Sequence, residues 1–294
     1  MYCGIDIGAS AAKLVIVDGD RRVIARSIRR SGVDYAATAE QCLAEALAAA
    51  GLTGDNVTGH PLTPSPPHPL TPSPTTHHPP PATLLAASVS TGYGRDNVPW
   101  VDSRATEIAC HGKGAFHYFR RAMTVIDIGA QDSKVIHLDA AGRRTGFKMN
   151  RKCAAGTGAF LEEIAYRLDL PLSDLNGLAE RSTKEVTLGS FCTVFAATEV
   201  LEKIRAGQRV EDIVKGAYHS VVKRVIEMDA IQGALVLTGG VVAHHPLFVR
   251  LAEQAFKTPA LVPPEPQFVG ALGAALLALE RTEKGGGWSV AGGG

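Results

Sequence analysis

The sequence predicts an α/β fold of two lobes that enclose a cleft. Two observations carry this prediction. First, apolar runs of strand length alternate along the chain with amphipathic stretches of helix length. Second, one strand–turn–strand pattern occurs twice, because Ile5-Asp6-Ile7-Gly8-Ala9 matches Ile126-Asp127-Ile128-Gly129-Ala130 residue for residue. Two such copies, each opening one half of the chain, indicate a duplicated structural unit.

The repeated pattern extends beyond its glycine turn, because Lys13 in the first copy matches Lys134 in the second. A glycine turn between two strands lets backbone N–H groups approach phosphate oxygens closely. An aspartate at the strand end can hold Mg²⁺ opposite those phosphates. Two facing hairpins of this kind would clamp the β- and γ-phosphates of ATP. The sequence therefore predicts an ATP-binding cleft in which Asp6 and Asp127 hold Mg²⁺.

The other elements follow from apolar periodicity and from turn residues. In the first half we expect strands at residues 2–8, 13–17 and 23–28, and a helix at 35–50 that Gly51 ends. Further along, the same criteria predict strands at 84–90, 124–128, 134–138, 234–237 and 260–262. They also predict helices from residue 106 onward and at 157–168, 193–206, 210–230, 246–256 and 269–279.

A proline-rich stretch interrupts the first half of the chain. Residues 60–81 hold ten of the 17 prolines, and the segment His60–Pro66 recurs at residues 68–74. Because proline cannot donate to a helix or a sheet ladder, we expect a disordered, solvated insertion at about residues 56–82. It is most simply a tolerated surface insertion, with docking or metal capture by its histidines as alternatives. We predict an N-terminal lobe at 1–122 that carries this insertion, a C-terminal lobe at 123–284, and a flexible glycine-rich tail at 285–294.

Composition and charge exclude several classes of function. The chain of 294 residues is 45% hydrophobic and 20% charged, with a formal net charge of +1. A near-neutral chain lacks the concentrated basic surface that nucleic acids require, so we expect no nucleic-acid partner. No apolar run reaches the roughly 20 residues of a membrane span, and no signal peptide is recognisable, so we expect a cytoplasmic protein without a membrane partner.

Two of the five cysteines stand before predicted helices. Cys153 precedes the helix at 157–168, and Cys192 precedes the helix at 193–206. The unpaired N–H groups of a helix start favour a thiolate, which is a metal ligand or a nucleophile. Two thiolates cannot complete a four-cysteine iron–sulfur site in one chain, whereas a symmetric dimer would supply four. Simple packing is the alternative for both, and it is the expectation for Cys3, Cys42 and Cys110.

Several motifs together resemble one known family. Asn150-Arg151-Lys152-Cys153-Ala154-Ala155-Gly156-Thr157-Gly158 and Cys192-Thr193-Val194-Phe195-Ala196 closely resemble the two cluster motifs of the BadF/BadG/BcrA/BcrD ATPase family. Thr91-Gly92-Tyr93-Gly94-Arg95 and the segment from Asp127 to Lys134 are similar to it as well. That family includes activators of 2-hydroxyacyl-CoA dehydratases and subunits of benzoyl-CoA reductase. The resemblance covers nearly the whole chain outside the proline insertion and the glycine tail.

The resemblance implies a fold and a set of site residues. The implied fold has two ribonuclease H-like lobes, as in the actin, Hsp70 and sugar-kinase ATPases, with a nucleotide cleft between them. The candidate catalytic residues are Asp6, Asp127, Gln131 and Asp132. The implied cofactor-binding residues are Gly8, Ser10, Lys13, Gly129, Lys134, Gly156, Thr157, Gly158, Gly239 and Gly240. The implied metal ligands are Cys153 and Cys192.

The resemblance also implies cofactors, partners and an activity. These are ATP, Mg²⁺, and one [4Fe–4S] cluster that bridges a homodimer. The implied activity is ATP hydrolysis that drives a low-potential electron into a partner (R)-2-hydroxyacyl-CoA dehydratase or a benzoyl-CoA reductase-like enzyme. Ferredoxin or flavodoxin is the implied electron donor.

The chain departs from the family pattern at three alanines. Ala9 stands where a hydroxyl is usual, Ala130 where a second glycine is usual, and Ala197 where an acidic residue is usual. Two other functions are also consistent with the sequence. One is a small-molecule kinase of the sugar or pantothenate type on the same fold, with Asp132 as base. The other is a nucleotide sensor or scaffold without catalysis.

Overall fold

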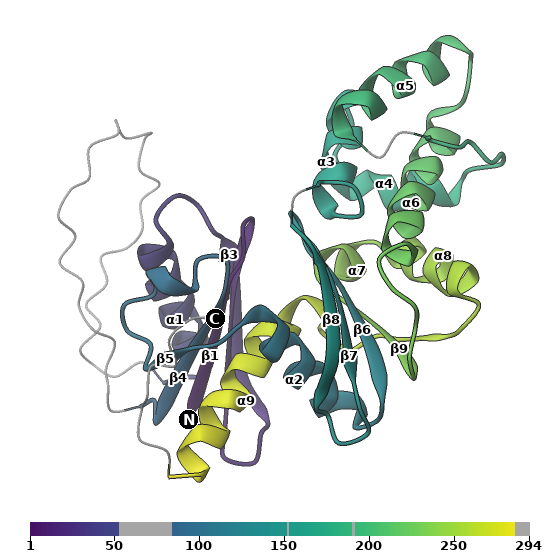
Figure 1. Ribbon diagram of the computed structural model, residues 1–294. Helices are drawn as coiled ribbons and strands as arrows, with labels where there is room; N and C mark the ends of the chain where they lie inside the picture. The colour runs from purple at the N-terminus through teal and green to yellow at the C-terminus, as the bar shows by residue number, and fades with distance from the viewer. Residues whose placement is uncertain (53–83, 152, 190–191, 286–294) are drawn as a thin grey trace, which may run out of the picture.

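Two five-stranded mixed sheets with the same strand order form the framework of the computed structural model (Figure 1). The structure describes residues 1–52, 84–151, 153–189 and 192–285. The predicted proline-rich insertion and almost all of the predicted tail lie outside these residues. In the described chain, the first sheet has the order β3-β2-β1-β4-β5 and the second has the order β10-β9-β6-β7-β8. Read from its other edge, the second order is β8-β7-β6-β9-β10, so each strand has a counterpart at the same position in the first sheet.

The two sheets are built in the same way. In each, an antiparallel meander of three strands is extended by two parallel strands. The strands of the first sheet are β1 (Tyr2–Ile7), β2 (Ala11–Val17), β3 (Val23–Arg30), β4 (Ala87–Gly92) and β5 (Ser103–Arg104). Those of the second are β6 (Met123–Ile128), β7 (Ser133–Leu138), β8 (Arg144–Asn150), β9 (Ala234–Thr238) and β10 (Ala260–Leu261). The duplication inferred from the repeated hairpin therefore extends to the whole sheet.

The strand register places equivalent residues of the two halves at equivalent positions. Asp6 of β1 lies opposite Lys13 of β2, as Asp127 of β6 lies opposite Lys134 of β7. On its other side, β1 pairs with the parallel strand β4, and β6 pairs with the parallel strand β9. Parallel neighbours of this kind are joined by crossover connections. Because the glycine turns join β1 to β2 and β6 to β7, both turns lie at the same end of their sheets.

Helices cover both faces of each sheet. They are α1 (Tyr35–Ala49), α2 (Glu107–Phe119), α3 (Gly158–Arg167), α4 (Leu175–Glu180), α5 (Thr193–Arg205), α6 (Val210–Ile226), α7 (Gly240–His244), α8 (Pro246–Phe256) and α9 (Val269–Glu283). The described residues also form short 3₁₀ turns, namely η1 (Arg95–Asn97), η2 (Leu172–Asp174) and η3 (Pro266–Phe268). No helix in the described part of the chain is both long and apolar enough to cross a membrane.

Side-chain alternation along β6 shows how a sheet buries both of its faces. Ile126 and Ile128 pack into a core with α3, α6 and α8, whereas Met123 and Val125 pack into a second core with α2. A strand buried on both faces carries a nearly continuous apolar run, and this explains why β6 was predictable from sequence. Strand β8 was not predicted, because it is an exposed edge strand and its sequence Arg-Thr-Gly-Phe-Lys-Met-Asn lacks such a run.

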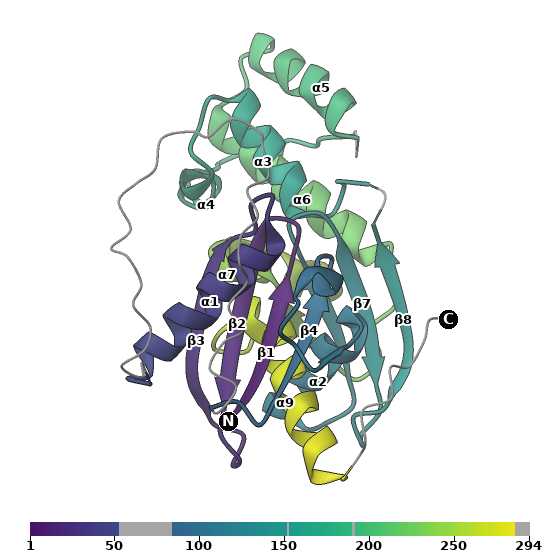
Figure 2. The same cartoon turned by 90° about the vertical axis from the view of Figure 1, so that its left-hand side faces the viewer.

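Two helices connect the sheets between the lobes (Figures 1 and 2). Helix α9 packs on β1, β2 and β4, and helix α2 packs on the second sheet and on α9. A methyl group on Gly273 of α9 would overlap the carbonyl oxygen of Cys110 on α2, and one on Gly114 of α2 would overlap that of Val269. Glycine therefore permits the close approach of the two helices that sets one lobe against the other.

A buried histidine joins three helices of the second half. His245 stands between α7 and α8, is 5% exposed, and places its Nδ1 2.6 Å from the hydroxyl of Tyr218 on α6. Burial lowers the pKa of His245 to about 4, because the charged imidazolium is poorly solvated there. In the unfolded chain the same group titrates near pH 6.5.

We therefore expect acid to destabilise the fold partly through His245. Between about pH 6.5 and pH 4 the unfolded chain binds a proton that the folded chain excludes, so stability falls as pH falls. The contribution is at most about 1.4 kcal/mol per pH unit in that window. Urea unfolding of the wild type and of His245→Gln at several pH values would measure it. The variant should show the shallower pH dependence, and equal slopes would contradict the assignment.

Candidate functional site

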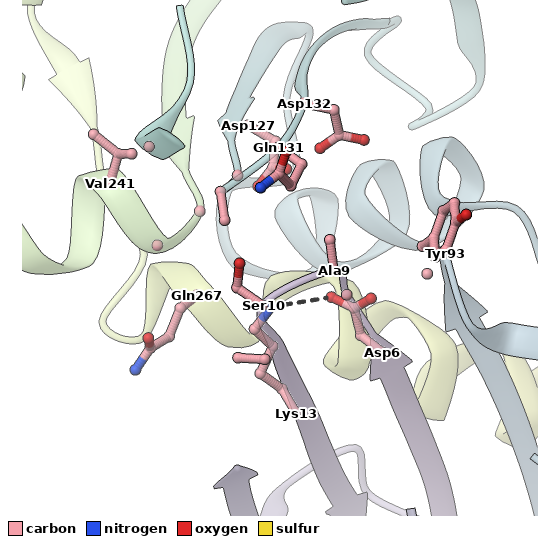
Figure 3. Close-up of a pocket in the computed structure, with 18 of the residues that line it drawn as sticks. Asp6, Ala9, Ser10, Lys13, Tyr93, Asp127, Gln131, Asp132, Val241 and Gln267 are labelled. Carbon is pink, nitrogen blue, oxygen red and sulfur yellow. Dashed lines mark ion pairs between the residues drawn. The ribbon is translucent and has the colours of Figure 1, made fainter. Parts of the chain in front are cut away.

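The two glycine turns face each other across a cleft of about 1030 Å³ between the two halves of the molecule (Figure 3). The first hairpin brings Asp6, Ala9, Ser10 and Lys13 to one wall. The second brings Asp127, Gln131 and Asp132 to the opposite wall. The turn between β9 and α7, at Gly239 and Gly240, closes a third side.

Most of the residues predicted for this site meet in the cleft. Those that line it are Asp6, Gly8, Ser10, Lys13, Asp127, Gly129, Gln131, Asp132, Lys134, Gly158, Gly239 and Gly240. Gly156 and Thr157 are buried in the turn before α3 and are not among the residues that line the cleft. Cys153 and Cys192 lie elsewhere, in segments that precede α3 and α5.

The first hairpin holds its lysine loosely. The N–H of Gly8 donates to the carbonyl of Ala11 at 3.1 Å and closes the turn. Lys13 Nζ lies 3.8 Å from Asp6 Oδ2, and the Lys13 side chain keeps 18% of its surface exposed to the cleft. A cation so weakly engaged is free to bind phosphate oxygens.

The second hairpin holds its lysine tightly. The turn is closed by the N–H of Gly129, which donates to the carbonyl of Asp132 at 2.9 Å. Lys134 Nζ lies 2.7 Å from Asp132 Oδ1, 3.0 Å from Glu107 Oε2 and 3.4 Å from Asp127 Oδ2. Burial alone would lower the pKa of Lys134, but the three carboxylates raise it above its ordinary value. The ammonium is therefore charged, and it is saturated with protein ligands.

Asp127 is the most constrained carboxylate of the site. It accepts a hydrogen bond at 2.9 Å from the hydroxyl of Thr238, and His111 Nδ1 lies 3.2 Å from its Oδ1. Burial opposes ionisation, yet the charges of His111 and Lys134 and the bond from Thr238 hold the pKa of Asp127 well below its usual range. Asp127 is therefore ionised. Burial lowers the pKa of His111, but the charge of Asp127 beside it raises that pKa above its ordinary value.

Three of these partners were missed in the sequence analysis, namely Glu107, His111 and Thr238. Glu107 and His111 stand on the first two turns of α2, and the sequence marks them only as polar positions near a helix start. They are nevertheless 7% and 6% exposed, because α2 packs against the second sheet. Thr238 had a usable signal, since it ends the strand before the predicted Gly239-Gly240 turn.

The charges of the cleft suit a nucleotide with a divalent cation. Glu107, Asp127 and Asp132 supply three carboxylates to one lysine at the second hairpin, and Asp6 supplies a fourth across the cleft. Oxygen ligands of this kind hold Mg²⁺ directly or through water. Lys13 and the N–H groups of the glycine turns provide the positive side that phosphates need. The arrangement can therefore bind a magnesium–nucleotide and polarise its terminal phosphate.

The cysteines divide into a buried and an accessible group. Cys3, Cys42 and Cys110 are fully buried, as expected for core residues, and burial raises the pKa of Cys110 to about 12. Cys153 is half-buried and Cys192 is exposed. Cys192 caps the N-terminus of α5, as predicted. Cys153 is not at a helix terminus, because Thr157 is the N-cap residue of α3 and three residues lie between the two.

Helices α3 and α5, which follow the two accessible cysteines, pack against each other. They belong to the helical part of the second half, which projects beyond the sheets (Figure 1). Both thiol-bearing segments therefore lie on the same side of the cleft as the second hairpin.

Comparison with known proteins places this site in a defined context. The chain is 35% identical over 285 residues to the activator of lactoyl-CoA dehydratase of Anaerotignum propionicum, covering 96% of this chain and 98% of that one. It superposes with a TM-score of 0.82 on the crystal structure of component A of the (R)-2-hydroxyglutaryl-CoA dehydratase of Acidaminococcus fermentans. That structure is 34% identical, with 96% of this chain and 98% of that chain covered.

A second solved structure carries a nucleotide. It is the activator of the 2-hydroxyisocaproyl-CoA dehydratase of Clostridium difficile with bound ADPNP, at a TM-score of 0.81 and 33% identity. The comparison covers 99% of this chain and 100% of that one. A glucokinase of the ROK family from Streptomyces griseus shares only the fold, with a TM-score of 0.51 and 13% identity over 95% of this chain and 98% of that one. The predicted sugar-kinase type of fold is therefore confirmed.

The model of the BadF/BadG/BcrA/BcrD ATPase family matches residues 3–278, which span both hairpins, the cleft and both accessible cysteines. This match and the relatives that align over nearly their whole length show that the chain belongs to the BadF/BadG/BcrA/BcrD ATPase family.

Proposed function

We propose that this protein is an ATP-hydrolysing activator that drives a low-potential electron into a partner enzyme. The partner would be an (R)-2-hydroxyacyl-CoA dehydratase or a benzoyl-CoA reductase-like enzyme. The observation that carries the proposal is the pairing of a nucleotide cleft with two accessible cysteines in a chain that aligns end to end with dehydratase activators.

The accessible cysteines fit a cluster shared between two chains. Cys153 and Cys192 precede helices that pack together, whereas the other three cysteines are buried in the cores. A [4Fe–4S] cluster takes four thiolates, so two copies related by a two-fold axis would complete the set. The proposed assembly is therefore a homodimer with one bridging cluster. When bound, that cluster would hold and release one electron at low potential.

The residues of the cleft have separate tasks in this proposal. Lys13 and the N–H groups of the two glycine turns hold the phosphates. Asp6 and Asp127 hold Mg²⁺, while Gln131 and Asp132 orient the attacking water. ATP binding and hydrolysis can promote electron transfer only if the nucleotide binds one arrangement of the cysteines more tightly than another. Ferredoxin or flavodoxin in the cytoplasm is the proposed electron donor.

The kinase alternative has less support. It assigned Asp132 as the base that accepts a proton from a substrate hydroxyl. Asp132 Oδ1 instead lies 2.7 Å from Lys134 Nζ, so this oxygen is already engaged in an ion pair within the protein.

We predict that Cys153 and Cys192 are both required for iron binding. The wild type purified without oxygen should contain about four irons per dimer and absorb in the visible range. Cys153→Ser and Cys192→Ser should each lose the iron, because each removes two of the four ligands from the dimer. Cys42→Ala is the matched control, since Cys42 is buried among alanines on α1, and it should retain iron. Colourless, iron-free wild type would reject the proposed cluster.

We also predict that Asp127→Asn abolishes most Mg²⁺-dependent ATP hydrolysis. The amide keeps the size of the side chain but removes the negative charge that faces Mg²⁺, and the expected loss of kcat is about 100-fold or more. Asp6→Asn should impair hydrolysis as well. Asp169→Asn is the control, because Asp169 is exposed in the same half and has a φ of 54°, which asparagine tolerates. Wild-type turnover by Asp127→Asn would refute the assigned role.

A further inference from the structure

Side chains donate hydrogen bonds to the backbone carbonyl groups of the turn at residues 153–157, which is called the Cys153 turn below. Asn150 Nδ2 donates to the carbonyl of Cys153 at 2.9 Å and to that of Ala155 at 2.8 Å. The hydroxyl of Thr157 donates to the carbonyl of Ala154 at 2.6 Å, and the hydroxyl of Ser133 donates to that of Gly156. Four successive carbonyls therefore have side-chain donors, and the shape of this turn is fixed by three residues.

Two of these donors come from one position in the second sheet. Ser133, the first residue of β7, lies opposite Asn150, the last residue of β8. Ser133 is fully buried and Asn150 is half-buried. Their side chains thus leave the end of the sheet together and bind the turn through which the chain passes from β8 to α3. Strands β7 and β8 continue directly from the turn of the second hairpin, the phosphate-binding hairpin of β6 and β7, because Ser133 follows Asp132.

The far end of the turn is bonded to the hairpin itself. The N–H of Gly158 donates to the carbonyl of Gly129 at 2.9 Å, and the N–H of Ala159 donates to that of Ala130 at 2.7 Å. Gly158 packs so closely on the hairpin that a methyl group there would lie 3.2 Å from the Cα of Ala130. The two residues of the hairpin turn therefore contact the first turn of α3 directly.

The local backbone allows little independent movement of the turn. Gly156 has a φ of +80°, a conformation that only glycine adopts without strain. Two ion pairs make a second connection to the hairpin. Arg151 lies 3.7 Å from Glu107, and Glu107 lies 3.0 Å from Lys134. The Cys153 turn is thus connected to residues that line the nucleotide cleft on both sides, through Arg151 before it and through Gly158 after it.

We propose that Ser133 and Asn150 are positioning residues that join the second phosphate hairpin and the Cys153 turn into one mechanical unit. This inference rests on the proposed function, in which nucleotide occupancy must reach the cysteines. Phosphates bound at Gly129 and Ala130 displace the hairpin, and the displacement passes to Cys153 because the turn cannot deform on its own. Neither residue contacts nucleotide or cluster in this scheme.

The test measures the chemical accessibility of Cys153, so it does not depend on iron or on a partner enzyme. Cluster-free, full-length protein is alkylated with iodoacetamide in Mg²⁺ buffer, with and without a non-hydrolysable ATP analogue. Peptide mass spectrometry gives the rate at Cys153, and Cys192 serves as an internal comparison. In the wild type, nucleotide should change the Cys153 rate by a factor of about five, as expected when hydrogen bonds of ordinary net strength are shifted.

Asn150→Asp should abolish this nucleotide response. The substitution keeps the size of the side chain but replaces the donating amide by a carboxylate, which repels the carbonyls of Cys153 and Ala155. Nucleotide affinity and ATP hydrolysis should stay near those of the wild type. Asn176→Asp is the matched control, because Asn176 lies on α4 and its Oδ1 continues to accept from the N–H of Leu247. Ser133→Ala, which removes the donor to Gly156, should also abolish the response and decides the matter if Asn150→Asp does not fold.

Two results would overturn the inference. One is a wild type that binds the analogue without any change at Cys153, or with a change at Cys192 alone. The other is a folded Asn150→Asp or Ser133→Ala variant with an undiminished response. Iron content tests the proposed function separately, so iron-free protein with a nucleotide response at Cys153 would reject the cluster while supporting the mechanical unit.

Discussion

The buried ammonium of Lys134 is the interaction on which the cleft depends. It binds Asp127 at the end of β6, Asp132 in the hairpin turn and Glu107 on α2, and so holds two strands, a turn and an interlobe helix together. Loss of the ammonium would leave the buried carboxylates of Asp127 and Glu107 without this cation, at a cost of about 3–5 kcal/mol. Because α2 also packs on α9, which covers the first sheet, the same cluster fixes the second hairpin relative to the first lobe.

The duplicated hairpins have consequently diverged in what their lysines do. Lys13 and Lys134 occupy the same register position opposite equivalent aspartates. Lys13 lies 3.8 Å from Asp6 and remains partly exposed, whereas Lys134 is 4% exposed and surrounded by carboxylates. An exposed ammonium can bind phosphate at little cost, but a saturated one must first give up protein ligands. The two halves therefore share a backbone plan and differ in electrostatics, with the acidic half better suited to the metal and the first half to the phosphates.

The second half also carries the accessible cysteines, and their attachment to the hairpin follows from the same architecture. The edge strand β8 ends at Asn150, so the chain must turn there before α3 begins. The first two residues of α3, Gly158 and Ala159, then donate to the carbonyls of Gly129 and Ala130. Ala9 and Ala130 both line the cleft. Cys192 stands at the start of α5, and the packing of α5 against α3 links the two helices that follow the accessible cysteines.

The sequence by itself determined the two-lobed α/β fold, the duplication, most of the strands and helices, and the residues of both hairpins. These features depend on local pattern, since apolar runs, glycine turns and a repeated motif are visible in any stretch of chain. Only the tertiary structure decided that Glu107 and His111 belong to the cleft, that Lys134 is saturated while Lys13 is not, and that Asn150 holds the turn after Cys153. These properties arise from α2 packing against a sheet formed later in the chain and from an exposed edge strand without an apolar pattern. Polar side chains acquire such roles from neighbours distant in sequence, and no local spacing encodes those neighbours.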